Sequence, residues 1–159
     1  MARNNRRFIT LLVPIFILFS VTASGCGASK SMASHEPDVT SMIRIVPMAS
    51  MVDMPSEVKA APVVVRQSYQ FAVANPDVLQ HVACYCGCGK MGHKSNYMCY
   101  VKNAEGGKVI YDNHALGCSI CVDITQDAMR LYKDGKSIKE IRDYVDAAYS
   151  KYGPTNLSE

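Results

Sequence analysis

Six of the seven cysteines of this 159-residue chain lie close together in the sequence, with two histidines among them. Thiolates and neutral imidazoles are ligands that Zn²⁺ and Cu(I) favour, and a thiolate is also the nucleophile of disulfide exchange. The grouping therefore predicts a site for a thiophilic metal or for thiol chemistry. The eight candidate metal ligands are Cys84, Cys86, Cys88, His93, Cys99, His114, Cys118 and Cys121.

The first three of these cysteines form a C-x-C-x-C run that also contains Gly87 and Gly89. Glycine permits tight turns of the backbone, so three sulfurs on this loop can face one centre. A disulfide between residues two apart closes almost no loop and stabilises little. The run therefore favours metal ligation over a set of simple cross-links.

The last two cysteines, Cys118 and Cys121, form a C-x-x-C pair just before a predicted helix. A helix N-terminus stabilises the thiolate form of a nearby cysteine. This placement suits a metal ligand and a redox-active thiol equally. The pair is therefore also the alternative redox site, with the C-x-C-x-C run as its partner or electron source.

The two histidines of the group have weaker signals than the cysteines. His93 lies between Cys88 and Cys99 and is either a metal ligand or an exposed loop residue. His114 lies four residues before Cys118 and is either a ligand or a residue that orients the loop through its ring N–H, with Asp112 as the acceptor. We expect no ligand role for the remaining histidines, His35 and His81.

Three functions remain open from these residues. The first is binding or relay of a transition metal, with Cu(I) or Zn²⁺ as the expected ion and Hg²⁺ sharing the same preference. The second is a thiol–disulfide module, and the third is a disulfide-stapled structural or binding lipoprotein without metal. We expect binding rather than catalysis and assign no catalytic residue. The chain has no P-loop, His-Glu-x-x-His or Gly-x-Ser-x-Gly motif that would indicate an enzyme of those classes.

The N-terminus has the pattern of an export signal. Three arginines precede a short apolar run, and small residues follow directly before Cys26. Residues 1–25 are therefore predicted to be a signal peptide, and Cys26 resembles the lipidated cysteine of a bacterial lipobox. Plain secretion and an uncleaved anchor helix are the alternatives. We expect a lipid-anchored protein on the extracytoplasmic face of the cell membrane, since more than one acyl chain gives lasting attachment.

The remaining chain is predicted to divide into three parts. Residues 26–65 show no sustained hydrophobic period and are expected to form a flexible tether, residues 66–153 a cysteine-rich domain, and residues 154–159 a C-terminal tail. The net charge of +3 equals the three leader arginines, so the rest of the chain is neutral. This balance argues against nucleic acid as a partner. The expected partners are the membrane and a protein that exchanges metal or electrons with this one.

The patterns in the domain predict an α+β fold that is mainly helical, with one short β-hairpin. Asn75-Pro76-Asp77 indicates a first helix, and Asp123 with Gln126 indicates a second. Ser137 and Glu140 have the spacing of a capping box at the start of a third, whose apolar face is Ile138, Ile141, Val145, Ala148 and Tyr152. The hairpin is expected to pair residues 98–101 with 109–111 across a turn at 103–107.

The motif Ala83-Cys84-Tyr85-Cys86-Gly87-Cys88-Gly89, with Gly92-His93-Lys94-Ser95-Asn96 and Cys99, resembles the bacterial PCYCGC-motif lipoproteins. The similarity continues through Tyr111-Asp112-Asn113-His114, the C-x-x-C pair and Gly135-Lys136-Ser137, and it covers roughly residues 66–153. Ala83 stands where the name-giving motif has proline. The resemblance implies a membrane-anchored extracytoplasmic protein and supplies no mechanism.

A second resemblance covers only residues 117–153. The C-x-x-C pair, the following helix and Gly135-Lys136-Ser137 are similar to the thiol-oxidoreductase domain of cytochrome c maturation, a small helical bundle. The redox motif of that domain has arginine before its first cysteine, where this chain has Gly117. The resemblance therefore implies two similar helices and only indirectly a redox function.

Overall fold

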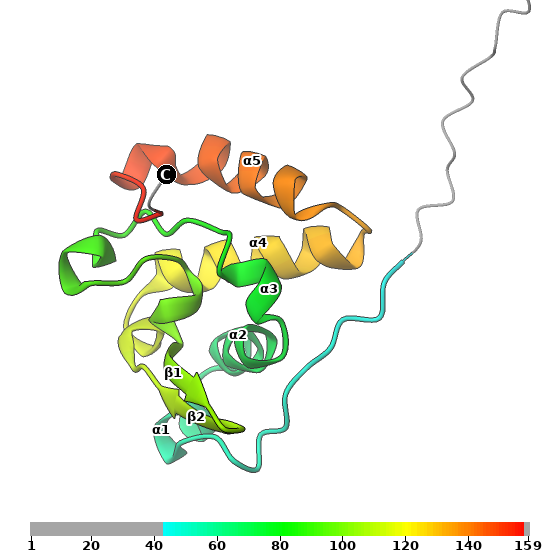
Figure 1. Ribbon diagram of the computed structural model, residues 1–159, viewed down its shortest axis with the longest axis vertical. Coiled ribbons are helices and arrows are strands. Elements are labelled where there is room, and N and C mark those ends of the chain that lie inside the picture. Colours follow the sequence, from blue (N-terminus) through cyan, green and yellow to red (C-terminus); the bar gives the residue numbers. More distant parts are fainter. Residues whose placement is uncertain (1–42, 158–159) are drawn as a thin grey trace, which may run out of the picture. The chain divides into compact units, whose positions relative to one another are not determined.

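The computed structural model describes residues 43–157 (Figure 1). The predicted signal peptide, the lipidation site Cys26, the first part of the predicted tether and His35 lie outside the described residues. The α-helices are α1 Ser56–Ala60, α2 Val63–Ala74, α3 Pro76–Leu79, α4 Ser119–Lys133 and α5 Ile138–Tyr149. The strands are β1 Val101–Glu105 and β2 Lys108–Tyr111, and the short 3-10 helices are η1 Cys88–Met91, η2 Tyr97–Cys99, η3 His114–Leu116 and η4 Ser150–Tyr152. The predicted α+β class with one hairpin is confirmed.

Helix α4 lies at the centre of the described domain. It packs against α2 on one side and α5 on the other, and the hairpin and the cysteine loop lie at its N-terminal end (Figure 1). Each of these elements buries apolar side chains in one continuous core. The fully buried members from the helices include Tyr69, Phe71, Leu79, Ile124 and Ile141. This core is what holds the N-terminus of α4 against the loops.

The prediction that α4 begins near Asp123 is wrong, because the helix begins at Ser119 and Cys118 is its N-cap residue. Gln126 does not cap the helix. Its amide donates to the carbonyl of Val64 and the hydroxyl of Ser68, both at 3.0 Å, which ties α4 to α2. The earlier start places Cys121 inside the first turn of the helix, where its side chain faces the core.

The predicted end of α4 and the predicted start of α5 are both observed. Gly135 has a φ of +81° after the last helical turn. Its N–H donates to the carbonyl of Tyr132 and that of Lys136 to Leu131, which is a Schellman motif. Ser137 and Glu140 form the reciprocal hydrogen bonds of a capping box.

The apolar face predicted for α5 is buried only in its middle. Ile141 and Val145 are fully buried. Ile138 is 36% exposed at the start of the helix and Tyr152 is 54% exposed beyond its end. The helix stops at Tyr149, followed by η4 and then Gly153-Pro154. The ends of the predicted stripe therefore extend past the surface of α4 against which the helix packs.

The hairpin is shifted from its predicted position. Gly106 and Gly107 both have positive φ and form a two-residue turn, so Asn103 to Glu105 stay in strand β1 instead of joining the turn. Residues 98 and 99 belong to η2 rather than to the strand. The register pairs Ala104 with Val109 and Glu105 with Lys108.

Helix α3 begins at Pro76 as predicted, but it ends at Leu79. The longer helix α2 lies before it, although its first residues are three consecutive valines with low helix propensity. Residues 43–65 contain α1, and they bury Met54 and Val58 against the core. The boundary at residue 65 between a tether and a domain stays a prediction.

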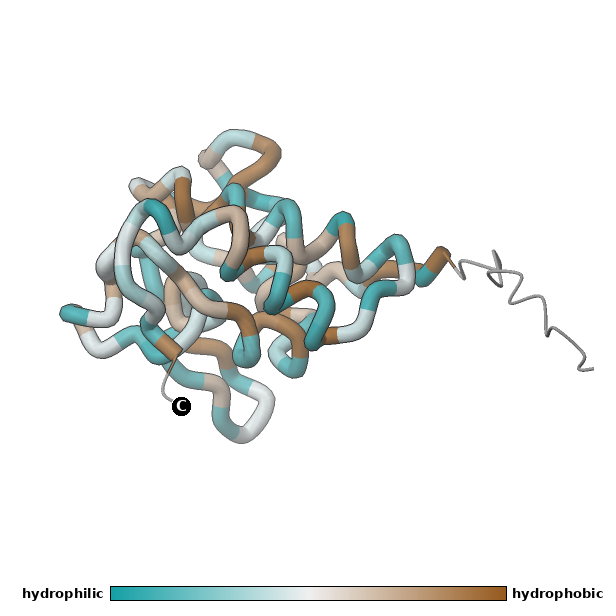
Figure 2. Tube along the Cα trace, turned by 90° about the horizontal axis from the view of Figure 1, so that it is seen from above, coloured by the Kyte–Doolittle hydropathy of each residue, from teal (hydrophilic) through white to brown (hydrophobic). Residues whose placement is uncertain are grey.

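Among residues 43–157 no helix is both long and apolar enough to cross a membrane. Figure 2 shows hydrophobic and hydrophilic residues interspersed along the described trace.

Candidate metal centre

The C-x-C-x-C loop connects α3 to η1 and turns sharply at one residue. Gly87 has a φ of +85°, a conformation that favours glycine, and directly precedes η1. Val82, Ala83 and Cys84 before it are fully buried, so the loop is anchored in the core at its start. The tight turn after Cys86 brings Cys88 back toward the same side of the loop.

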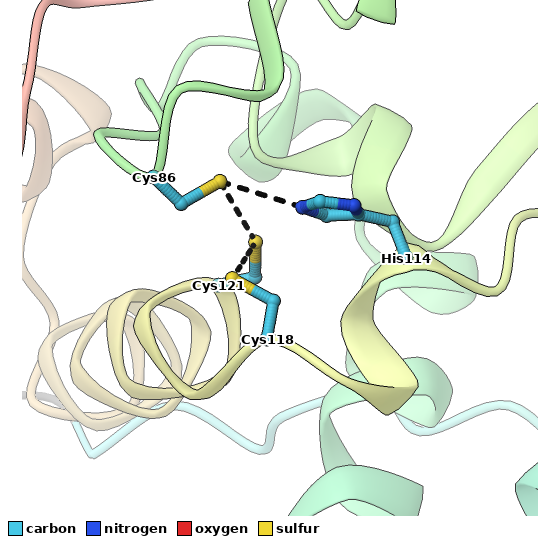
Figure 3. A group of neighbouring side chains, drawn as sticks. All are labelled: Cys86, His114, Cys118 and Cys121. Atoms are coloured by element: carbon cyan, nitrogen blue, oxygen red, sulfur yellow. Dashed lines mark hydrogen bonds between the residues drawn. The ribbon is translucent and has the colours of Figure 1, made fainter.

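Four of the candidate ligands form a group that we call the His114 lobe: Cys86, His114, Cys118 and Cys121 (Figure 3). Their ligand atoms all lie within 4.8 Å of one another. The sulfur of Cys86 is 3.4 Å from Nε2 of His114 and 3.5 Å from the sulfur of Cys121. The sulfurs of Cys118 and Cys121 are 3.1 Å apart. The C-x-C-x-C loop, η3 and the start of α4 therefore each contribute ligand residues to this group of four.

Three further candidates form the His93 lobe: Cys88, His93 and Cys99. The sulfurs of Cys88 and Cys99 are 3.7 Å apart. The side chain of His93 is almost fully buried between them and the hairpin. Among the described residues, its Nδ1 is the buried side-chain nitrogen without a hydrogen-bond partner. An unpaired buried nitrogen costs free energy unless something binds it, which makes Nδ1 a natural position for a metal ligand.

Cys84 lies between the two lobes and is fully buried. Its sulfur is 3.4 Å from the sulfur of Cys86 and 3.4 Å from that of Cys121, both in the His114 lobe. It also lies within 4.8 Å of the sulfurs of Cys88 and Cys99 in the His93 lobe. The six sulfurs therefore form one connected cluster rather than separate pairs.

The six thiols of this cluster cannot all ionise without a cation beside them. Hydrogen bonds with Cys121 lower the pKa of Cys84 to about 7 and lower the pKa of Cys88 further still, so these two sulfurs carry negative charge most readily. Burial and the neighbouring charge of Cys84 raise the pKa of Cys86 above its ordinary value. A bound cation favours the ionised form of every thiol that ligates it, because metal binding to thiols releases their protons.

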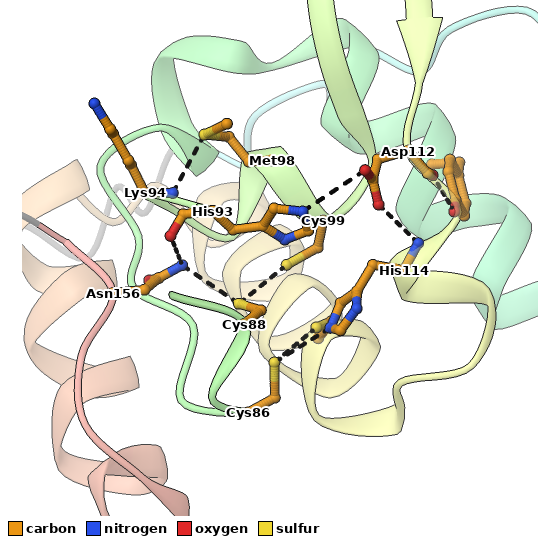
Figure 4. Close-up of polar contacts among 11 residues, drawn as sticks. Cys86, Cys88, His93, Lys94, Met98, Cys99, Asp112, His114 and Asn156 are labelled. Carbon is orange, nitrogen blue, oxygen red and sulfur yellow. Dashed lines mark hydrogen bonds and ion pairs between the residues drawn. The ribbon is translucent and has the colours of Figure 1, made fainter. Parts of the chain in front are cut away.

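Asp112, directly after β2, fixes both histidines (Figure 4). One of its carboxylate oxygens lies 3.6 Å from Nε2 of His93, and the other accepts a hydrogen bond from the backbone N–H of His114 at 2.8 Å. The two imidazole rings meet edge to face with centroids 5.2 Å apart. The predicted alternative, in which Asp112 accepts from the ring of His114, is therefore not what is observed. The carboxylate orients that residue through its backbone, and Nε2 of its ring faces Cys86 instead.

A buried polar network supports the base of the cluster. The carbonyl of Cys121 accepts hydrogen bonds from the amide of Asn96 at 3.2 Å and from the hydroxyl of Tyr100 at 2.9 Å. The hydroxyl of Thr125 donates to Oδ1 of Asn96 at 2.6 Å. Asn96, Tyr100 and Thr125 are all fully buried. The network fixes the first turn of α4 to the loop before the hairpin, and so fixes the position of Cys121.

The C-terminal segment passes over the cysteine loop, and Asn156 joins the two. Its Oδ1 accepts from the backbone N–H of Cys84 at 2.6 Å. Its amide donates to the carbonyl of His93 at 3.2 Å and points at the sulfur of Cys88 at 3.5 Å (Figure 4). At Gly153 a Cβ atom would stand 2.7 Å from the carbonyl oxygen of Tyr85, so the close approach requires glycine.

The structure thus brings together all eight residues that the sequence singled out. His81 is exposed and belongs to none of these Cys/His groups. Sequence reasoning missed Asn156, which belongs to the predicted tail, and it missed the supporting roles of Asn96 and Thr125. The spacing of these residues carries no signal that links them to the cysteines.

Comparison with known proteins identifies the family of this chain. The family model described as "protein of unknown function with PCYCGC motif" matches residues 15–157. The chain therefore belongs to the PCYCGC-motif family, as the resemblance implied. Neither the curated proteins nor the solved structures provide a match. The similarity to a thiol-oxidoreductase domain stays a prediction.

Proposed function

We propose that this member of the PCYCGC-motif family is a membrane-anchored, extracytoplasmic lipoprotein that binds and relays a thiophilic transition metal, Cu(I) or Zn²⁺. The observation that carries the proposal is the convergence of six sulfurs and two imidazoles on one small volume. Nδ1 of His93 is buried and has no hydrogen-bond partner, so it is available as a further metal ligand in that volume.

The spacing of the sulfurs supports coordination rather than cross-linking. Cys121 has three sulfur neighbours, at 3.1, 3.4 and 3.5 Å, whereas a disulfide uses only one. At a Zn–S distance of about 2.3 Å, two ligands of a tetrahedral ion lie about 3.8 Å apart. The observed contacts are close to that spacing, so a small shift of the side chains accommodates an ion.

The test is a competition titration of the reduced full-length protein against a chromophoric chelator, with Zn²⁺ and Cu(I) in separate experiments. The wild type is expected to withdraw metal from the chelator. The double variant Cys86→Ser/Cys121→Ser, which removes the two sulfurs nearest to Cys84, is expected to withdraw far less. His81→Ala is the matched control because His81 is exposed and outside the cluster. Equal behaviour of wild type and double variant would contradict the proposal.

The membrane anchor is a separate part of the proposal and has its own test. Cys26 follows small residues at the end of the apolar leader, as in lipidated bacterial proteins. Cys26→Ser is expected to move the protein from the membrane fraction to the soluble or secreted fraction. Retention of the variant in the membrane would instead indicate an uncleaved anchor helix.

Thiol–disulfide exchange is the second candidate function, supported by the C-x-x-C pair. The two sulfurs are 3.1 Å apart at the N-terminus of α4, and Cys118 is half-buried and so reachable. In this function the two thiols reduce a partner's disulfide to two thiols and become a disulfide themselves. The reduction potential of the pair tests it, since a value below about −300 mV is typical of a structural disulfide and would exclude exchange.

A further inference from the structure

We infer that the cluster holds two metal ions, one in each lobe, with the sulfur of Cys84 as a bridging ligand between them. This inference rests on the proposed metal-binding function and adds to it the number of ions and the residue that joins them.

Apart from Cys84, the donors divide into two groups. The His114 lobe contains four donors that lie within 4.8 Å of one another, and the His93 lobe contains three. No group whose donors all lie within 4.8 Å of one another contains all seven, and the two groups that combine donors of both lobes each include Cys84. Four donors suffice for a tetrahedral ion, so the His114 lobe is complete, whereas the His93 lobe lacks one ligand.

Cys84 belongs to neither lobe and lies beside both. Its sulfur lies within 4.8 Å of Cys88 and Cys99, so it is placed to supply the missing fourth ligand of the His93 lobe. The same sulfur lies 3.4 Å from both Cys86 and Cys121. That distance is close to the separation of about 3.8 Å between two sulfurs bound to one tetrahedral ion. A thiolate in this position reaches the ions of both lobes.

Cys84 is fully buried, and Cys88, Cys99 and Cys121 around it are buried as well. A buried thiolate needs compensating positive charge, and sharing Cys84 between two cations supplies that charge from both sides.

Sharing of Cys84 leaves a surplus of donors in the His114 lobe. With Cys84 included, the His114 lobe offers five donors, one more than a tetrahedral ion uses. Cys86, His114 and Cys118 are all half-buried, but Cys86 contacts Cys84, His114 and Cys121, whereas Cys118 contacts Cys121 at 3.1 Å. Cys118 is therefore the donor that can leave while the ion stays bound, and its loss weakens the His114 ion without separating the pair.

The experiment uses the reduced full chain carrying Cys26→Ser, so that only the six cluster cysteines react. Bound Zn²⁺, Cu(I) and Co²⁺ are counted by native mass spectrometry, and Co²⁺ is followed by electron paramagnetic resonance. Two high-spin Co²⁺ ions that share a thiolate couple antiferromagnetically. We expect two ions per chain and loss of most of the Co²⁺ resonance at saturation.

Variants separate the bridge from the other ligands. Cys84→Ala is expected to restore the resonance of whatever Co²⁺ remains bound, because it removes the shared sulfur. Cys118→Ala is expected to weaken one ion but to keep the coupled, resonance-poor state at saturation. His81→Ala, outside the cluster, is expected to match the parent protein. If Cys84→Ala fails to fold, the count and the resonance of the parent protein still decide the question.

The outcomes distinguish this inference from the function on which it rests. One ion per chain, or two ions whose resonance is fully additive, would overturn the bridged pair and leave metal binding intact. No bound ion with any of the three metals would overturn the proposed function itself. Two ions with the resonance lost at saturation support both.

Discussion

Oδ2 of Asp112 lies 3.6 Å from Nε2 of His93, on the opposite side of the imidazole from the unpaired Nδ1. A carboxylate next to one ring nitrogen holds the proton there and leaves the other nitrogen free to bind a metal. Asp112 itself is held in place, because its carbonyl accepts from the hydroxyl of Tyr69 at 2.7 Å and its N–H donates to the carbonyl of Tyr100 at 2.8 Å. The end of the hairpin is thereby connected to the chemistry of the cluster.

Asp112→Asn tests that relationship. The change keeps the size of the side chain but removes the charge that favours Nε2–H, so we expect metal affinity to fall by about 10- to 100-fold. The number of bound ions at saturation is expected to stay the same. Chelator competition measures the affinity, and Asp123→Asn, at an exposed position on α4, is the matched control. An unchanged affinity would show that Asp112 does not act on the ligand His93.

Asn156→Ala tests the contact between the C-terminal segment and the loop. The backbone N–H of Cys84 loses its acceptor, which costs about 1–3 kcal/mol when the group stays buried. We expect faster release of metal to a chelator and faster alkylation of Cys88 in the metal-free protein. Asn103→Ala, on the exposed part of β1, should change neither rate. If both variants release metal at the wild-type rate, the segment does not restrain the loop.

Thr125→Val tests the polar network under Cys121. The substitution keeps the shape of the side chain but leaves Oδ1 of Asn96 without its donor, and it removes the hydrogen bond that the hydroxyl of Tyr100 accepts. We expect the free energy of unfolding of the reduced, metal-free protein to fall by about 1–3 kcal/mol. Urea denaturation measures it, with Thr155→Val at an exposed position for comparison. A loss no larger than that of Thr155→Val would mean that the network adds little.

Ser137→Ala tests the capping box of α5, far from the cluster. The substitution is expected to lower the free energy of unfolding by about 1 kcal/mol at neutral pH, without changing metal stoichiometry. The hydrogen bonds from Ser137 lower the pKa of Glu140 from 4.5 to about 2. A depressed carboxyl pKa stabilises the fold above the ordinary value and loses that effect as the carboxylate is protonated. The difference between wild type and variant should therefore shrink as pH falls from 4.5 toward 2. A difference that stays constant across this range would contradict the role of the ionised Glu140.

The features that could be predicted from the sequence are those that local chemistry determines. The Gly135 cap, the capping box and the glycine turn of the hairpin each depend on a few neighbouring residues, and all three are present. The grouping of the cysteines was also readable, because alternate spacing and a C-x-x-C pair bring sulfurs together locally.

The features that escaped prediction depend on packing between distant parts of the chain. Helix α2 forms although three valines begin it, because it packs on α4, where Phe71 meets Tyr132, and because Tyr69 packs against Tyr100 and Tyr111. Asn156 reaches Cys84 across the fold, and Thr125 reaches Asn96, and no periodicity links either pair. In the C-x-x-C region, tertiary contacts stabilise a helix that begins at Ser119. The predicted start at Asp123 rested on a local capping residue, which carries no information about those contacts.

The most direct test of the account is a combined metal and thiol count on the full chain with Cys26→Ser, purified once under reducing and once under oxidising conditions. Elemental analysis gives the bound metal, and alkylation with mass spectrometry gives the free, protected and oxidised cysteines. The account predicts bound Zn²⁺ or Cu(I) in the reduced protein, with the six cluster thiols protected from alkylation until a strong chelator is added. Three disulfides and no bound metal in either preparation would contradict it.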